Sequence, residues 1–149
     1  MIYTGSCHCG RLKASFESQK TPQSLGVRTC QCEFCRRVGA VNISDPDGAV
    51  VIEGAERDMR RYRFALKTAD FLICRECGVY IAAVTGEKDN IRSTLNVAGL
   101  RIKDFLGVEE APMQYGAEDA ASRVARRAAK WTPTRFTDAG LNASYFGPH

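Results

Sequence analysis

Gly5-Ser-Cys-His-Cys-Gly10 places two thiols one residue apart near the start of the chain. The same spacing returns in Thr29-Cys-Gln-Cys-Glu-Phe-Cys-Arg36, where a third thiol follows, and a last pair lies in Cys74-Arg-Glu-Cys-Gly78. Cysteines at such spacings can point their sulfurs at one metal ion about 2.3 Å away, and glycine lets the chain turn tightly beside them. The three groups therefore predict that metal-binding loops organise this fold.

The seven cysteines fall into these groups with none left over. An odd number does not suit a disulfide framework, and no secretory signal is visible, so we expect the cytoplasm, where thiols stay reduced. A tetrahedral zinc needs four ligands. We therefore expect two pairs to form one closed site, and Cys30, Cys32 and Cys35 to form a second site with one position open.

Other interpretations of the cysteines are weaker. Free cysteines are usually small buried hydrophobes, but random scatter would not group them. A redox role for Cys74 and Cys77 would be expected near a βαβ pattern, which the flanking segments do not show. His8 lies between two expected ligands and should point away from their metal, and no role is expected for His149.

Length and composition indicate a single globular domain over residues 1–149, with 44% hydrophobic and 26% charged residues. The longest apolar runs, such as 48–52 and 79–84, are far shorter than the ~20 residues of a membrane span, so we expect no membrane partner. The formal net charge of +4 would fall to about +1 with seven thiolates and two zinc ions bound. Any anion binding must then come from local arginines.

Short strands dominate the expected secondary structure. Leu12, Ala14 and Phe16 alternate with polar residues, and Tyr62 and Phe64 alternate with arginines. Residues 50–52, 71–73 and 79–84 form continuous apolar runs, and 91–97 is rich in strand formers. The sequence therefore predicts a mainly β fold with the cysteines on the loops between strands.

One segment, residues 117–130, has the pattern of a helix. Small apolar residues recur at spacings of three and four, acidic residues begin the segment and basic residues end it. We expect this helix to pack lightly on the domain through its apolar stripe. Nucleic-acid binding by its basic face is a weaker alternative, because basic patches alone are poor evidence, and we expect no nucleic-acid partner. Residues 132–149 give no clear pattern.

The three cysteine groups, followed by Thr94-Leu-Asn-Val97, resemble the glutathione-dependent formaldehyde-activating enzyme (GFA) family, whose domain also occurs in centromere protein V. The resemblance covers about residues 1–106. It implies a twisted β fold of the Mss4-like type and carbon–sulfur lyase chemistry of the S-(hydroxymethyl)glutathione synthase type. By position it implies a structural zinc at Cys7, Cys9, Cys74 and Cys77, and a second zinc at Cys30, Cys32 and Cys35.

Three features depart from the family pattern and leave the substrate open. Glu33 replaces a small polar residue, Ile73 replaces an aromatic one, and the helix after Tyr115 replaces the usual C-terminal strands. Arg36 and Arg37 follow Cys35 and could hold carboxylates of a bound thiol, although simple surface charge explains them equally well.

The open site suggests how the chemistry would work. A thiol that binds zinc loses its proton and becomes a nucleophile, so we expect glutathione or a relative to add to a small aldehyde, or to leave in the reverse reaction. The second zinc should exchange more readily than the first. Glu33 is the only residue near the site with the chemistry of a general base. A non-catalytic, zinc-stabilised binding module is the alternative, and the oligomeric state is open.

Overall fold

The computed structural model describes residues 1–147, so His149 lies outside the described part of the chain. The strands are β1 (Ile2–Ser6), β2 (Lys13–Glu17), β3 (Val27–Cys30), β4 (Asn42–Ile43), β5 (Ala49–Glu53), β6 (Met59–Tyr62), β7 (Asp70–Cys74), β8 (Tyr80–Glu87), β9 (Asn90–Asn96), β10 (Glu110–Met113), β11 (Thr132–Phe136) and β12 (Tyr145–Phe146). The helices are α1 (Pro22–Leu25), α2 (Glu33–Val38), α3 (Val97–Leu100), α4 (Ala120–Lys130) and α5 (Ala139–Asn142), with 3₁₀ turns η1 (Glu56–Asp58) and η2 (Lys103–Phe105).

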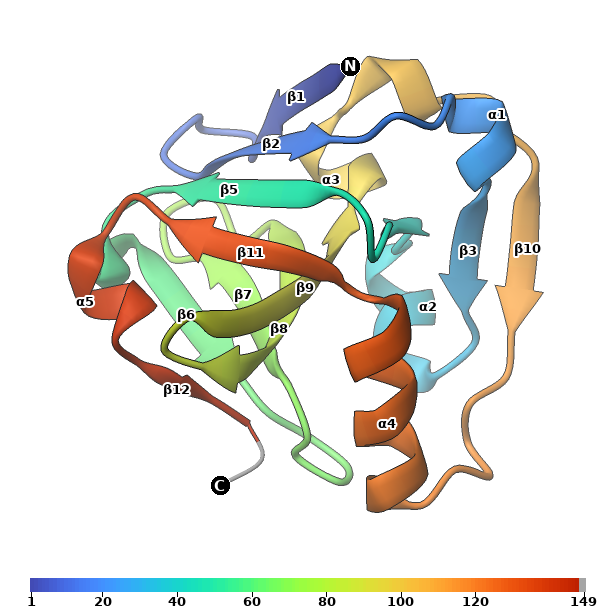
Figure 1. Cartoon of the computed structure of the whole chain (residues 1–149). Coiled ribbons are helices and arrows are strands. Elements are labelled where there is room, and N and C mark those ends of the chain that lie inside the picture. The colour runs from blue at the N-terminus through green and yellow to red at the C-terminus, as the bar shows by residue number, and fades with distance from the viewer. Residues whose placement is uncertain (148–149) are drawn as a thin grey trace.

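The strands form one twisted, mixed sheet (Figure 1). One path through it runs β1-β2-β5-β11-β9-β4-β3-β10. β9 also pairs with β8, β8 pairs with β7 and β12, and β7 pairs with β6. Parallel pairs join β10 to β3 and β11 to β5, whereas the other strand pairs are antiparallel. The predicted mainly β fold is confirmed.

β11 joins two parts of this sheet, although its segment gave no pattern in the sequence. Its residues 134–136 pair with β5, and Thr132 and Pro133 pair with β9. The Thr132 hydroxyl also accepts a hydrogen bond from the backbone N–H of Asp45, at 2.8 Å. The C-terminal segment is therefore an internal part of the sheet.

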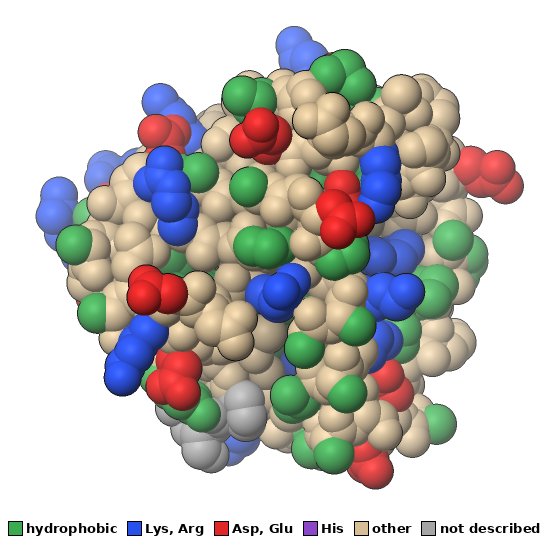
Figure 2. Space-filling model, in the orientation of Figure 1, with side chains coloured by type: hydrophobic (Ala, Val, Ile, Leu, Met, Phe, Trp, Pro, Cys, Tyr) green, Lys and Arg blue, Asp and Glu red, His purple; other side chains and the backbone are tan. Residues whose placement is uncertain are grey.

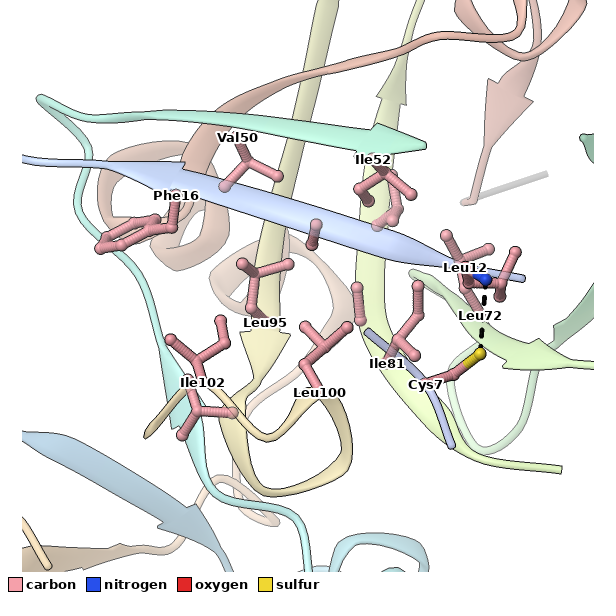
Figure 3. Close-up of a cluster of buried hydrophobic side chains, with 14 of the residues drawn as sticks. Cys7, Leu12, Phe16, Val50, Ile52, Leu72, Ile81, Leu95, Leu100 and Ile102 are labelled. Atoms are coloured by element: carbon pink, nitrogen blue, oxygen red, sulfur yellow. Dashed lines mark hydrogen bonds between the residues drawn. The ribbon is translucent and has the colours of Figure 1, made fainter. Parts of the chain in front are cut away.

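Two clusters of buried side chains support the sheet. The larger cluster includes Leu12, Phe16 and Ile52, all fully buried, and Figure 3 shows them with side chains from β7, β8 and β9. This confirms the core face predicted from the alternation in β2. The smaller cluster contains Tyr80 and Trp131 and is rich in aromatic side chains. Cys7 and Cys74 belong to the larger cluster, and Cys35 belongs to the smaller one. The two groups of cysteines expected to bind metal therefore have different surroundings.

The helical content differs from the expectation of one C-terminal helix. Four short helices accompany α4. α4 begins at Ala120 rather than 117, because the Asp119 side chain accepts a hydrogen bond from the Ser122 N–H at 2.7 Å and caps the helix. Among residues 1–147, no helix combines the length and apolar character needed to cross a bilayer.

The packing of α4 is the reverse of the expected one. Val124 and the alanines of the apolar stripe face outward, where Figure 2 shows hydrophobic side chains on the surface of the helix. Arg127 is buried instead. Alanine removes little apolar area from water, so the arginine side chains, which find aromatic and polar contacts, decide which face packs inward.

Candidate metal centres and the adjoining cavity

The first cysteine cluster, called here the four-thiol group, unites Cys7, Cys9, Cys74 and Cys77. Cys7 and Cys9 lie between β1 and β2, Cys74 ends β7, and Cys77 lies in the turn before β8. The four sulfurs lie within 4.8 Å of one another. Cys9 Sγ is 3.7 Å from Cys7 Sγ and 3.6 Å from Cys74 Sγ. This group could hold a metal ion.

Tight turns bring these sulfurs together. The N–H of Gly10 donates to the Cys7 carbonyl at 3.1 Å, and the N–H of Gly78 donates to the Cys74 carbonyl at 2.9 Å. Both glycines have φ near +80° (83° and 77°), where other residues are strained. The Leu12 N–H donates to Cys7 Sγ at 3.3 Å (Figure 3).

Without metal, the thiols of this group differ in their protonation. Burial raises the pKa of Cys74 to about 12. The pKa of Cys77 falls to about 6, because hydrogen bonds from the backbone N–H groups of Cys9 and Val79 outweigh the opposing effect of burial. A bound cation would favour the deprotonated form of every thiol in the group.

The second cluster, the three-thiol group, contains Cys30, Cys32 and Cys35, with sulfurs again within 4.8 Å. Contrary to the expectation of loops, Cys30 ends β3 and Cys35 lies inside α2. Cys32 is the N-cap of α2, and its sulfur accepts a hydrogen bond from the Cys35 N–H at 3.4 Å. Among the described residues, no histidine, acidic residue or further cysteine joins the group.

Cys30 and Cys35 differ in their pKa values. A hydrogen bond from the Cys35 thiol lowers the pKa of Cys30 to about 5. The same bond, together with burial, raises the pKa of Cys35. Three sulfurs with no fourth protein ligand are the arrangement in which a metal keeps a coordination position for a ligand from outside.

A cavity of about 300 Å³ adjoins the three-thiol group, and Cys30 and Cys35 form part of its wall. α4 and the residue after it supply another part of the wall, so segments far apart in sequence enclose one space. Most of the remaining wall is aromatic or cationic, from Phe71, Tyr80, Tyr115, Trp131, Arg28, Arg126, Arg127 and Lys130. The cavity can take a small organic ligand with negative charge.

Tyr80 contributes a buried hydroxyl to this cavity. Its side chain is 3% exposed. Burial raises the pKa of Tyr80 well above its usual value, and the nearby Cys35 and Cys30 sulfurs raise it further. The hydroxyl therefore stays protonated at neutral pH and can donate a hydrogen bond.

Arg36 and Arg37 lie outside the cavity wall, on the exposed surface of α2. They border a shallow hollow with Gln31 and Glu33, and Arg37 forms an ion pair with Glu33 at 2.6 Å. Their contact with a carboxylate stays a prediction, as does a role for Glu33 as base. His8 is exposed, as expected, and belongs to neither cysteine group.

The sequence did not predict Arg28, Tyr80 or the arginines of α4 as parts of the site. Two signals were present. Arg127 and Lys130 are three residues apart on one helical face, and Arg28 precedes Cys30 by two residues, so both belong to the same side of a strand. Neither signal shows that α4 folds back over β3.

The fold and the two cysteine groups define a mainly β protein that could bind two metal ions. The family model for the glutathione-dependent formaldehyde-activating enzyme, GFA, matches residues 2–104. The chain belongs to this family. β10, α4 and β11 lie beyond the matched residues.

A solved structure is also similar to this chain. A crystal structure of a Rhodobacter sphaeroides protein, determined as a structural genomics target, matches with 27% sequence identity and a TM-score of 0.50. The match covers 72% of this chain and 99% of the other. The comparison with curated proteins gives no match.

Proposed function

We propose that this protein forms a carbon–sulfur bond between a small thiol such as glutathione and a small aldehyde, or cleaves it in the reverse direction, with zinc at the three-thiol group. The observation that carries the proposal is the position of Cys30 and Cys35 in the wall of the cavity. None of the residues of the four-thiol group lines that cavity. Membership of a family described as glutathione-dependent and formaldehyde-activating supports the choice of substrates.

Zinc suits both cysteine groups. Sulfurs at the corners of a tetrahedron, each about 2.3 Å from zinc, are ~3.8 Å apart, and neighbouring sulfurs of the four-thiol group are 3.6 and 3.7 Å apart. That group would hold a structural zinc. At the three-thiol group, zinc would supply a position for the incoming thiol and lower that thiol's pKa.

The residues of the cavity would assist the addition. The thiol gives up its proton, its sulfur adds to the carbonyl carbon of the aldehyde, and the carbonyl oxygen becomes a hydroxyl by gaining a proton. Tyr80 stays protonated in the cavity wall and is suited to donate a hydrogen bond to that oxygen as negative charge develops on it. The protons lost and gained balance, so no other reactant is needed.

The test is a titration of zinc-loaded protein with glutathione by calorimetry, followed by NMR detection of adducts with ¹³C-formaldehyde. We expect glutathione binding and adduct formation faster than the uncatalysed reaction in the wild type, and loss of both in Cys32→Ser. Arg36→Ala shows in the same assays whether the exposed arginines of α2 contribute. If no glutathione binds at millimolar concentration, the proposal fails, and a non-catalytic, zinc-stabilised binding module becomes the better account.

A further inference from the structure

Arg127 is a buried cation without an acidic partner. Its side chain is 7% exposed. One guanidinium nitrogen, Nη1, donates to Thr68 Oγ1 at 2.5 Å, and the group lies 4.7 Å above the centre of the Trp131 ring. Arg127 Nε is buried and has no hydrogen-bond partner among the described residues, none of which pairs with it as an acid. Burying such a charge costs free energy unless an anion compensates it.

Arg126, the residue before Arg127, does have an acidic partner, so the lack of one is not a general property of the arginines of α4. Arg126 donates from Nε and Nη2 to the two carboxylate oxygens of Glu118, at 2.9 and 3.0 Å. The fold thus supplies an acid for Arg126 and none for Arg127, although both line the cavity. Burial accordingly lowers the pKa of Arg127 to about 10.

Two further side chains extend this pattern. Arg28, half-buried in the wall, donates to Ser44 Oγ at 2.6 Å and forms no ion pair with a described residue. Asn42 is 8% exposed, and its Oδ1 atom has no donor among the described residues. The cavity therefore offers charged donors together with an acceptor, which suits a carboxylate close to an N–H or O–H group.

The negative charge of the three thiolates is too small to neutralise the cationic side chains of the cavity wall. Zinc with three thiolates carries a charge of about −1. Arg28, Arg127 and Lys130 line the cavity without an ion pair to a described residue, and their three positive charges exceed it by two. A ligand that brings two negative charges would neutralise the cavity.

We propose that Arg127 anchors a carboxylate of the cavity's ligand, so that α4, which lies outside the family match, makes this chain select carboxylate-bearing substrates. The inference rests on the proposed function for the identity of the reacting sulfur. The anchoring itself does not require a free thiol. The carboxylate can belong to the thiol or to the aldehyde.

The experiment uses S-methylglutathione, which keeps both carboxylates but has no free thiol, and its diethyl ester, in which both are capped. Calorimetry on zinc-loaded protein compares the wild type with Arg127→Gln and with Arg135→Gln, which removes an exposed charge of β11 outside the cavity. We expect the ester, and the Arg127→Gln variant, to bind about tenfold more weakly or worse. Arg135→Gln should bind like the wild type.

Thermal melting shows whether Arg127→Gln folds. If it does not, Lys130→Gln, at an exposed residue of the same wall, replaces it, with a loss of about threefold expected. A second arm compares glyoxylate with formaldehyde in the adduct assay. A preference for glyoxylate that disappears in the variant places the carboxylate on the aldehyde.

Equal binding of S-methylglutathione and its ester, with no preference for glyoxylate, would overturn the inference. Unchanged behaviour of a folded Arg127→Gln variant in both arms would overturn it too. The proposed function fails differently: glutathione then binds no better than S-methylglutathione, and the protein does not speed adduct formation above the uncatalysed rate.

Discussion

The two cysteine groups of this protein arise from similar sequence spacings but have different surroundings. Cys7 and Cys74 of the four-thiol group belong to the main hydrophobic core, together with Leu12 and Leu72. The three-thiol group packs against the smaller aromatic cluster and borders a cavity. The number of sulfurs and the residues around them, rather than the sequence spacing, therefore distinguish a site suited to holding the fold from one suited to binding a ligand.

The largest expected effect is loss of the fold when the four-thiol group is broken. Cys77→Ser should abolish cooperative unfolding, because structural zinc contributes about 10–16 kcal/mol of apparent binding free energy, as much as the whole stability of about 5–15 kcal/mol. Circular dichroism during heating, with metal analysis, measures this. A soluble Cys77→Ser variant that melts cooperatively without its metal would remove the distinction between the groups.

The second effect is loss of one metal with the fold kept. Cys32→Ser should reduce the zinc content from two ions to one, because serine can still cap α2 by accepting from the Cys35 N–H. The free energy of unfolding should change by less than about 1 kcal/mol beyond the lost metal. Mass-spectrometric metal analysis checks this, and loss of both ions would mean that the groups are not independent.

The third effect concerns the reaction rate alone. Tyr80→Phe should lower the enzyme-dependent rate of adduct formation about a hundredfold, the lower end of the usual contribution of one hydrogen-bond donor to a developing oxyanion. Metal content should stay at the wild-type value, because Tyr80 is not a ligand. NMR of the aldehyde adduct gives the rate. An unchanged rate in a zinc-loaded Tyr80→Phe variant would exclude Tyr80 as the donor.

The smallest effect concerns the attachment of α4. Hydrogen bonding from Arg126 lowers the pKa of Glu118 below its usual value of 4.5. The ion pair is therefore complete above about pH 4.5 and is lost as the pH falls through the lowered pKa. Arg126→Gln should return the Glu118 pKa toward its usual value and cost about 0.5 kcal/mol of stability. A ¹³C NMR titration of the Glu118 carboxyl measures the shift, and an equally low pKa in the variant would show that Arg126 is not its cause.

The strands and the division of the cysteines could be predicted because they depend on local patterns. The alternation of apolar and polar residues around Leu12 and Phe16 shows which side chains are buried. Because a tetrahedral zinc needs four ligands, seven cysteines divide into one set of four and one set of three. The periodicity of α4 predicted a helix but not which face packs, because alanines contribute little to packing. β11 includes Pro133 and lacks alternation, and its place between β5 and β9 depends on pairing with distant strands.

The cavity could not be predicted for the same reason. Its wall joins β3, β8 and α4, so no single window of sequence contains it. Arg36 and Arg37 attracted attention because they follow Cys35, whereas Arg127 is more than 90 residues away in sequence. Choosing substrate-binding residues by their nearness in sequence to Cys35 therefore selected arginines on the outer surface of α2.

The most direct test of the central claim, that only the three-thiol group accepts a thiol ligand, is ¹¹³Cd NMR of the cadmium-loaded protein during a glutathione titration. Cadmium replaces zinc at thiolate sites and gives one resonance for each environment. We expect two resonances in the wild type and one in Cys32→Ser, and glutathione should shift only the resonance that this variant lacks. If glutathione leaves both resonances unchanged, or shifts the one that Cys32→Ser retains, the account is contradicted.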